Sequence, residues 1–219
     1  MSVPGSFASA AVPQPLADDE IHVWLCELDG DAAARRRGAQ AFLHRLLAGY
    51  CGRAVDELVL EAGAHGKPAL AGAPLAFNLS HAADAAVVAL ARGVEVGIDL
   101  ESPSRPRPHA ELARRYFRAR EADAVEAAAA DEREPTFLRL WTAKEAVLKA
   151  IGRGLAFGLD RLEFDLGANP PRLRQIADEA GDATEWQVRA LPLPLPRIGH
   201  LAWRGEARRI RFFRPVIQA

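Results

Sequence analysis

The pattern of apolar and polar positions predicts a chain that mixes helices and strands. Residues 21–25 are bulky and apolar, as in a strand, although the acidic run before them could also cap a helix. Residues 31–50 are rich in alanine and place Phe42, Leu43, Leu46 and Leu47 at helical spacing, which predicts a helix. Further strands are expected at 58–61, 86–91 and 94–100. The last two are joined by a hairpin-like turn at Arg92-Gly93.

A proline-rich stretch divides the chain. Pro103, Pro106 and Pro108 alternate with serine and arginine, which disfavours both helix and strand and is typical of a linker. Beyond it the pattern predicts helices and then strands, at 110–117, 119–130, Pro135 to Gly152, 162–165, 185–191, 200–203 and 210–213. The expected organisation is an α+β fold with a flexible N-terminal tail at 1–19, one lobe at 20–103 and a second lobe at 104–219.

Composition and charge exclude several function classes. Hydrophobic residues make up 49% of the chain and charged residues 26%, as in an ordinary globular protein. The net charge of −1 gives no bulk attraction to nucleic acid. No apolar run has the length of a membrane span, and no signal peptide is expected at the N-terminus. Cys26 and Cys51 suit two free thiols in a reduced, cytoplasmic protein.

Two short segments carry the chemistry. Asp99 and Glu101 alternate with aliphatic residues, so on a strand both carboxylates share one face. Glu145 and Lys149 are four residues apart, so on a helix they lie one above the other. Three carboxylates and an ammonium suit a site for Mg²⁺ and phosphate. Taken singly, each pair also fits a polar strand edge or a solvated helix face, which are frequent features.

Four segments in order decide between these interpretations. They are Gly66-Lys67-Pro68, Phe77 to His81, Gly97 to Glu101, and Trp141 to Lys149 followed by Gly152 to Leu155. In this order and spacing the chain resembles the surfactin-type (Sfp-type) 4′-phosphopantetheinyl transferases, from about residue 66 to about residue 164. The resemblance implies two similar α+β lobes in a pseudo-dimeric fold, with the site between them.

The resemblance also implies an activity. Enzymes of this holo-[acyl-carrier-protein] synthase type transfer 4′-phosphopantetheine from coenzyme A to a serine of an apo acyl or peptidyl carrier protein. They require Mg²⁺ and release adenosine 3′,5′-bisphosphate. The expected partners are therefore coenzyme A and a carrier protein of fatty acid, polyketide or nonribosomal peptide biosynthesis, with no nucleic acid and no membrane. We expect a monomer.

Roles for individual residues follow from the same resemblance. Asp99, Glu101 and Glu145 match metal-binding carboxylates, and Glu145 is also the candidate to take the serine proton, directly or through water. Asp99, Glu145 and Lys149 form the catalytic set, in which Lys149 pairs with a pyrophosphate oxygen. The residues expected to contact coenzyme A are Lys67, Ser80, His81, Lys144 and Lys149.

One of these assignments, that of Lys144, has an open alternative. Lys144 falls in the middle of an apolar helical stripe, so it either makes a second phosphate contact or extends its ammonium past a small neighbour to water. Asn78 is expected to fix the local backbone through its amide. At Ala82 and Ala83 relatives often carry other residues, so contacts to coenzyme A are expected to be reduced there.

The N-terminal part departs from the family pattern. Relatives usually have a basic, aromatic segment between the first strand and first helix. Here Leu28-Asp-Gly-Asp runs directly into the helix, where Arg35, Arg36 and Arg37 either substitute for that segment or face solvent. A second group of arginines either docks an acidic carrier protein or forms a solvated face: Arg105, Arg107, Arg114, Arg115, Arg118 and Arg120. Two alternative functions remain, a non-catalytic coenzyme A-binding relic of the family and another Mg²⁺-dependent phosphoryl-transfer enzyme.

Overall fold

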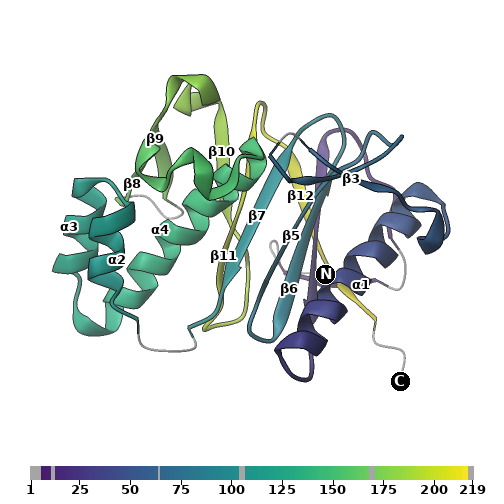
Figure 1. The fold of residues 1–219 in the computed structure, drawn as a ribbon, viewed down its shortest axis with the longest axis horizontal. Coiled ribbons are helices and arrows are strands. Elements are labelled where there is room, and N and C mark those ends of the chain that lie inside the picture. The colour runs from purple at the N-terminus through teal and green to yellow at the C-terminus, as the bar shows by residue number, and fades with distance from the viewer. Residues whose placement is uncertain (1–5, 11–12, 64, 104–106, 168–170, 217–219) are drawn as a thin grey trace.

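The centre of the fold is a pair of β-sheets packed face to face, with helices on both outer faces (Figure 1); the described residues also form two separate two-stranded sheets. The computed structural model describes residues 6–10, 13–63, 65–103, 107–167 and 171–216. Its main elements are β1 (Ala8–Ala10), β2 (Glu20–Glu27), α1 (Ala32–Cys51), β3 (Leu60–Ala62), β4 (Pro68–Leu70), β5 (Ala76–Ala82), β6 (Ala85–Ala91), β7 (Val96–Glu101), α2 (His109–Tyr116), α3 (Ala119–Ala127), α4 (Ala130–Ile151), β8 (Leu162–Asp165), β9 (Arg172–Ile176), β10 (Trp186–Ala190), β11 (Ile198–Arg204) and β12 (Arg209–Pro215). The expected α+β class is confirmed.

The first sheet has the strand order β1-β12-β2-β6-β5, and α1 covers its outer face. Asp31 caps α1 by accepting a hydrogen bond from Ala34 N at 2.8 Å, and Gly52 ends it in a left-handed conformation. The apolar stripe of α1 packs on Trp24 and Phe77 of the sheet. The helix predicted at 31–50 is therefore confirmed.

The second sheet has the order β10-β11-β7, and α4 lies across its outer face with α2 and α3 beyond (Figure 1). Apolar and acidic side chains alternate along β7 and lie on opposite faces of this sheet. Ile98 and Leu100 are buried in the layer between the two sheets, which leaves Asp99 and Glu101 on the face toward α4. The two carboxylates therefore share one face of the strand, as predicted, because the opposite face packs in the core.

A glycine allows α4 to approach β7 closely. A Cβ atom at Gly97 would lie 2.0 Å from the carbonyl oxygen of Ala146 and 2.3 Å from the amide nitrogen of Ala150. Real Cβ contacts are never this short, so any larger residue would displace the helix from the strand. The close approach brings the C-terminal part of α4 onto the strand that carries Asp99.

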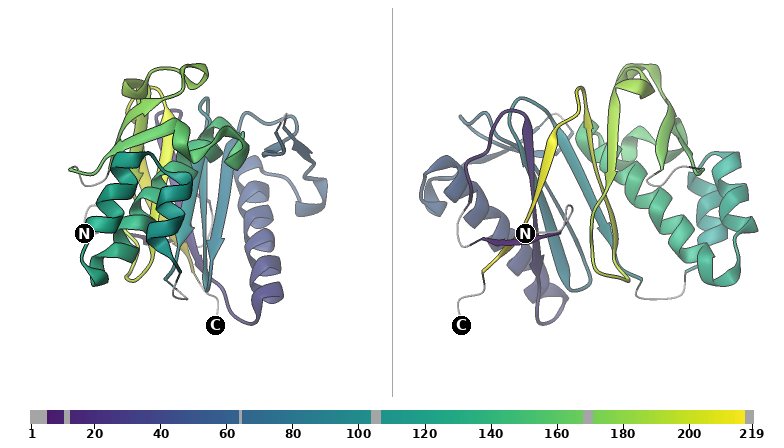
Figure 2. Two further views of the ribbon diagram at one scale, coloured as in Figure 1. Left: turned by 60° about the vertical axis from the view of Figure 1, so that its left-hand side comes forward. Right: turned by 180° about the vertical axis from the view of Figure 1, so that it is seen from behind.

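The expected lobe boundaries need correction. Strands β6 and β7 do not form the predicted hairpin, because β6 pairs with β2 and β5 whereas β7 pairs with β11 in the other sheet. Strand β12 returns from the C-terminal half to pair with β2, as Figure 2 shows (yellow beside purple). The division into 20–103 and 104–219 therefore fails at two strands, since each sheet borrows a strand from the other half of the chain.

Three local predictions also differ. The expected tail at 1–19 contains β1, which pairs in parallel with β12. The long helix α4 begins at Ala130 rather than near Pro135, because an alanine and acidic first turn extends it. The strands β4, β5 and β9 were not predicted; β5 carries the segment from Phe77 to His81. No helix in the described part of the chain is long and apolar enough to cross a membrane.

Candidate functional site

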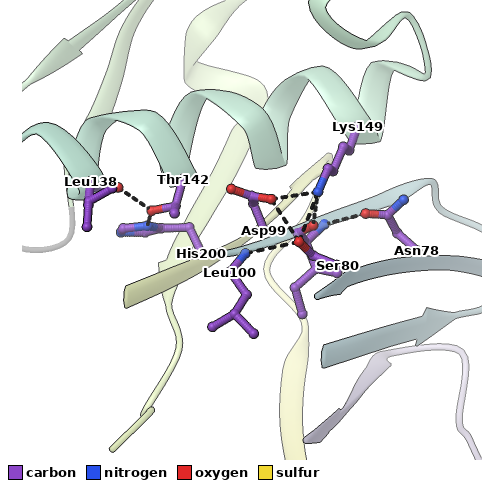
Figure 3. Close-up of polar contacts among 9 residues, drawn as sticks. Asn78, Ser80, Asp99, Leu100, Leu138, Thr142, Lys149 and His200 are labelled. Carbon is purple, nitrogen blue, oxygen red and sulfur yellow. Dashed lines mark hydrogen bonds and ion pairs between the residues drawn. The ribbon is translucent and has the colours of Figure 1, made fainter. Parts of the chain in front are cut away.

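Three of the predicted residues meet where β5, β7 and α4 come together (Figure 3). The Nζ atom of Lys149 lies 2.6 Å from Asp99 Oδ1 and 3.1 Å from Ser80 Oγ. Ser80 donates its hydroxyl hydrogen to Asp99 Oδ1 at 2.9 Å. Ser80 lies 19 positions before Asp99 in the sequence, and Lys149 lies 50 positions after it. Three separate segments of the chain thus form one polar cluster.

Side chains of β5, rather than its backbone, accept hydrogen bonds from the backbone amides of β7. The backbone amide of Ile98 donates to Asn78 Oδ1 at 2.8 Å, and the amide of Leu100 donates to Ser80 Oγ at 3.2 Å. These bonds satisfy amides on the edge of β7 that faces the other sheet. The structural role expected for Asn78 is confirmed, although its bond joins two strands rather than holding a loop.

The carboxylates of the cluster perturb one another. Burial raises the pKa of Glu145 to about 7; the negative charges of Asp99 and Glu101 act in the same direction and Lys149 opposes them. Burial, and then the charge of Asp99, also raise the pKa of Glu101. Each carboxylate is therefore close enough to make ionisation of another more costly, which is the condition that a cation relieves.

A divalent cation fits this cluster in part. Asp99 Oδ2 is buried and has no hydrogen-bond partner among the described residues. However, no three His, Cys, Asp or Glu side chains of the described residues converge closely enough to hold an ion. Mg²⁺ commonly takes only one or two carboxylates and fills its remaining positions with water and substrate phosphate. Asp99 and Glu145 therefore suit such a partial set, whereas a three-carboxylate cage with Glu101 stays a prediction.

Lys144 does not belong to the site, contrary to expectation. It is fully buried, and its Nζ atom lies 2.8 Å from Glu121 Oε2, 2.9 Å from Leu159 O and 2.6 Å from Leu162 O. All three ammonium hydrogens thus have partners inside the protein. Burial lowers the pKa of Lys144, and the ion pair with Glu121 opposes that shift. The prediction of a phosphate contact is wrong, because a buried glutamate 23 residues earlier satisfies the charge.

Lys67 and His81 lie outside the cluster. Lys67 Nζ is 2.6 Å from Glu95 Oε2 and donates to Val96 O at 2.9 Å. His81 is exposed at the end of β5 and alternates with Ser80, so its side chain leaves the opposite face of the strand. Near this end, Arg35 donates to the carbonyls of Gly30 and Ala83. The contacts of Lys67 and His81 with coenzyme A stay predictions.

Two cavities lie at opposite ends of β7. A cavity of about 570 Å³ is bounded by Lys67, by the residues 93–95 that precede β7, and by the end of α4 at 150–152. A second, of about 400 Å³, is bounded by Glu101 at the end of β7 and by apolar and aromatic side chains including Tyr116 and Trp141. The Lys149 and Asp99 cluster lies on the strand and helix between them.

Sequence reasoning missed Thr142 and His200, which join α4 to β11. Thr142 Oγ1 lies 2.8 Å from His200 Nδ1, and burial lowers the pKa of His200 to about 4. The imidazole is therefore neutral at pH 7. The two residues are 58 positions apart, and neither stands in a pattern that indicates the other.

Comparison with known proteins gives a consistent result. The model of the 4′-phosphopantetheinyl transferase superfamily matches residues 95–195. The chain is 33% identical over 201 residues to the 4′-phosphopantetheinyl transferase HetI of Nostoc sp., covering 76% of this chain and 84% of that protein. It is 36% identical over 125 residues to psf-1 of Bacillus pumilus, covering 57% and 52% of the two chains. It is 44% identical over 92 residues to AcpT of Salmonella typhimurium, covering 41% and 47%. Like HetI, psf-1 and AcpT are named as 4′-phosphopantetheinyl transferases.

Proposed function

The chain belongs to the 4′-phosphopantetheinyl transferase superfamily. From this we propose that it is an Sfp-type enzyme with holo-[acyl-carrier-protein] synthase activity. It transfers phosphopantetheine from coenzyme A to a serine of an apo acyl or peptidyl carrier protein. The observation that carries the proposal is the contact of Lys149 with Asp99 and Ser80. It unites, in one partly buried cluster, three of the four segments that matched the family pattern.

Coenzyme A binds first, with its pyrophosphate at Lys149 and Ser80. Lys149 supplies a compact positive charge, and the Ser80 hydroxyl can turn from Asp99 to a phosphate oxygen. The cavity beside Lys67 receives the nucleotide end, and the apolar cavity beside Glu101 receives the pantetheine arm. The six residues of β7 follow Glu95 and end at Glu101, a span of roughly 20 Å, which suits an elongated molecule such as coenzyme A.

A divalent cation completes the electrostatics. Asp99 and Glu145, with Glu101 beside them, are the residues that would hold Mg²⁺, and Asp99 Oδ2 is the buried oxygen without a partner among the described residues. When bound there, Mg²⁺ supplies a positive charge that polarises the phosphorus and offsets charge on the departing phosphate. The protein's own contribution is to keep these oxygens together despite their mutual repulsion.

The chemical step transfers one proton and exchanges one bond. The serine oxygen of the carrier protein forms a bond to the phosphorus that bears pantetheine. The bond from that phosphorus to the leaving phosphate breaks, and adenosine 3′,5′-bisphosphate departs with the bonding pair. Glu145 accepts the serine proton, directly or through water; a carboxylate with a pKa of about 7 in the metal-free protein is a suitable base near neutral pH.

The carrier protein docks beside the second cavity. Arg107 and Arg115 line this cavity next to Glu101. By contrast, Arg114 pairs with Asp123 and Glu126 of α3, so it is less available to a partner. Carrier proteins are expected to be acidic around their serine, so Arg107 and Arg115 are the members of the predicted arginine cluster best placed to attract them. Arg105 lies outside the described residues.

The enzyme is proposed to act as a cytoplasmic monomer. One chain supplies both sides of the cluster, β5 from the first sheet and β7 with α4 from the second. The free thiols Cys26 and Cys51 suit a reducing compartment.

The test is a transfer assay on apo carrier proteins. The purified chain is incubated with coenzyme A, Mg²⁺ and an apo acyl or peptidyl carrier protein, and the carrier's intact mass is followed. Addition of phosphopantetheine to its serine, abolished by excess EDTA and restored by Mg²⁺, is expected. Coenzyme A binding without any transfer would favour the relic, and transfer unaffected by EDTA would contradict the metal requirement.

A further inference from the structure

Thr142 and His200 form a buried hydrogen bond between α4 and β11 that the proposed transfer step does not use. Both residues are almost inaccessible to solvent. Thr142 Oγ1 donates to the carbonyl of Leu138 at 2.7 Å and lies 2.8 Å from His200 Nδ1. A hydroxyl has one hydrogen, so with that hydrogen on Leu138 O the imidazole Nδ1–H must be the donor to Thr142.

The register places this bond beside the polar cluster. His200 is directly opposite Asp99 in the antiparallel pairing of β11 with β7. Side chains of directly opposed residues leave the sheet on the same face, here the face covered by α4. On the helix, Thr142 precedes Glu145 by three residues and so lies on a neighbouring position of the helix surface. Figure 3 shows Thr142 and His200 on one side of Asp99 and Lys149 on the other.

The helix therefore has a polar attachment on each side of Glu145. Thr142 holds α4 to β11, three residues before it. Lys149 holds α4 to Asp99 and Ser80, four residues after it. Between these attachments the helix backbone rests on Gly97, where contact is too close to tolerate a side chain. Two attachments and a close backbone contact define where the carboxylate of Glu145 stands relative to Asp99.

We propose that Thr142 and His200 are a positioning pair that holds α4 so that Glu145 keeps the distance from Asp99 that phosphopantetheine transfer requires, an inference that rests on the proposed function. Neither residue contacts the reacting atoms. The expected signature is a loss in kcat with little change in KM for coenzyme A, because the phosphate contacts at Lys149 and Ser80 remain. A misplacement of about 1 Å can cost on the order of 10²-fold in rate.

The first test replaces the hydroxyl. Thr142→Val keeps the shape but removes the acceptor, and kcat should fall by roughly 10- to 100-fold while KM for coenzyme A stays within about threefold. Thr142→Ser restores the hydroxyl and should restore kcat to within about threefold of the unmodified protein. Equal kcat values for Thr142→Val and Thr142→Ser would overturn the proposal.

A double variant separates positioning from stability. In Thr142→Val the imidazole N–H loses its partner, whereas Thr142→Val with His200→Phe removes both polar groups. The melting temperature of the double variant should recover relative to Thr142→Val, but its kcat should stay low. Full recovery of kcat would overturn the proposal. If the double variant does not fold, the comparison of valine with serine at 142 decides on the same criterion.

The control removes a comparable hydrogen bond far from the site. Tyr50 in α1 accepts from Trp24 Nε1 at 2.8 Å and bonds His22 Nδ1 at 2.7 Å. Tyr50→Phe should lower the melting temperature and leave kcat unchanged. A fall in kcat as large as that of Thr142→Val would mean that loss of stability alone explains the effect, against the proposal.

Hydrogen–deuterium exchange gives a readout that needs no transfer. Amides of residues 142–149 should exchange faster in Thr142→Val than in the unmodified protein, and should be unchanged in Tyr50→Phe. Unchanged exchange in Thr142→Val would show that the pair does not hold the helix. Absence of transfer by the unmodified protein would contradict the proposed function instead, and the exchange result would still decide whether the pair holds α4.

Discussion

Lys149 Nζ lies 2.6 Å from Asp99 Oδ1, yet a quarter of the lysine side chain is exposed whereas Asp99 is buried. The pair thus sits at a boundary between the interior and solvent, with the ammonium on the outer side. An incoming phosphate can reach the partly exposed lysine, whereas Asp99 Oδ2, which has no hydrogen-bond partner among the described residues, lies buried behind it. In the metal-free protein, Lys149 provides part of the positive charge that this group of carboxylates requires.

Replacing Lys149 should affect activity more than folding. In Lys149→Ala the pyrophosphate loses its point charge, so kcat/KM for coenzyme A should fall by about 10²-fold or more. The free energy of unfolding should fall by less than about 3 kcal/mol, below the cost typical of breaking a fully buried pair, because a quarter of the lysine side chain is exposed and Asp99 keeps its hydrogen bond from Ser80. Steady-state kinetics and urea unfolding measure the two effects. A stability loss with normal kcat/KM in the folded fraction would contradict the assigned role.

Replacing Lys144 should affect folding more than activity. In Lys144→Met the buried carboxylate of Glu121 loses its counter-charge, which typically costs about 3–5 kcal/mol. KM for coenzyme A in the folded protein should stay within about twofold, since no phosphate reaches this site. Adding Glu121→Gln should recover part of the stability only, because Leu159 O and Leu162 O still lack donors. A large rise in KM with unchanged stability would restore the phosphate-contact interpretation.

The close contact at Gly97 makes a third prediction. In Gly97→Ala the added methyl group would overlap the backbone of α4, so the free energy of unfolding should fall by about 3 kcal/mol or more, and transfer should be lost as the helix moves away from β7. The matched control is Gly93→Ala, where no atom lies within 4 Å of the added carbon and the positive φ of 66° alone costs about 1 kcal/mol. Equal destabilisation by both variants would contradict the packing described for Gly97.

The raised pKa of Glu145 predicts how stability depends on pH in the absence of metal. Its pKa is about 7 in the folded protein against an ordinary value of 4.5, so the folded state binds the proton more tightly. The contribution of this group to stability is therefore fully present below pH 4.5 and is lost as pH rises to about 7. The loss amounts to at most about 3 kcal/mol, on the basis of 1.36 kcal/mol per pKa unit.

Denaturant unfolding in EDTA measures this contribution. Glu145→Gln cannot ionise, so its stability relative to the unmodified protein should increase between pH 5 and pH 8 by about 2–3 kcal/mol. A difference between the two proteins that is the same at both pH values would contradict the pKa shift. Glu101 adds a smaller trend of the same sign, since its pKa is also raised, and it is present in both proteins.

Much of the site could be predicted because its elements are local. Period-two alternation places Asp99 and Glu101 on one face of β7, and the core residues Ile98 and Leu100 occupy the other. The four-residue spacing of Glu145 and Lys149 needs only a helix. The family pattern then brings Ser80 to the same place, and the structure places it in contact with both Asp99 and Lys149.

What the sequence could not give depends on distant partners. Alternation along β7 indicates its faces but not its neighbour, so a short turn suggested β6 while the actual partner is β11. The position of Lys144 in an apolar stripe predicts an unusual environment, but only the fold brings Glu121 to it. The bond between Thr142 and His200 joins residues 58 positions apart without any sequence pattern.

Glu145 and its neighbours are proposed to catalyse the transfer of phosphopantetheine from coenzyme A to a carrier serine. The most direct measurement compares the single-turnover rate of the unmodified protein with that of Glu145→Gln, by the intact mass of an apo carrier protein in the presence of saturating coenzyme A and Mg²⁺. We expect transfer by the unmodified protein and a rate lower by about 10²–10⁴ in Glu145→Gln, with coenzyme A still bound, because the variant keeps the size of the side chain but loses its basicity and charge. Transfer by Glu145→Gln at the unmodified rate would contradict the role assigned to Glu145.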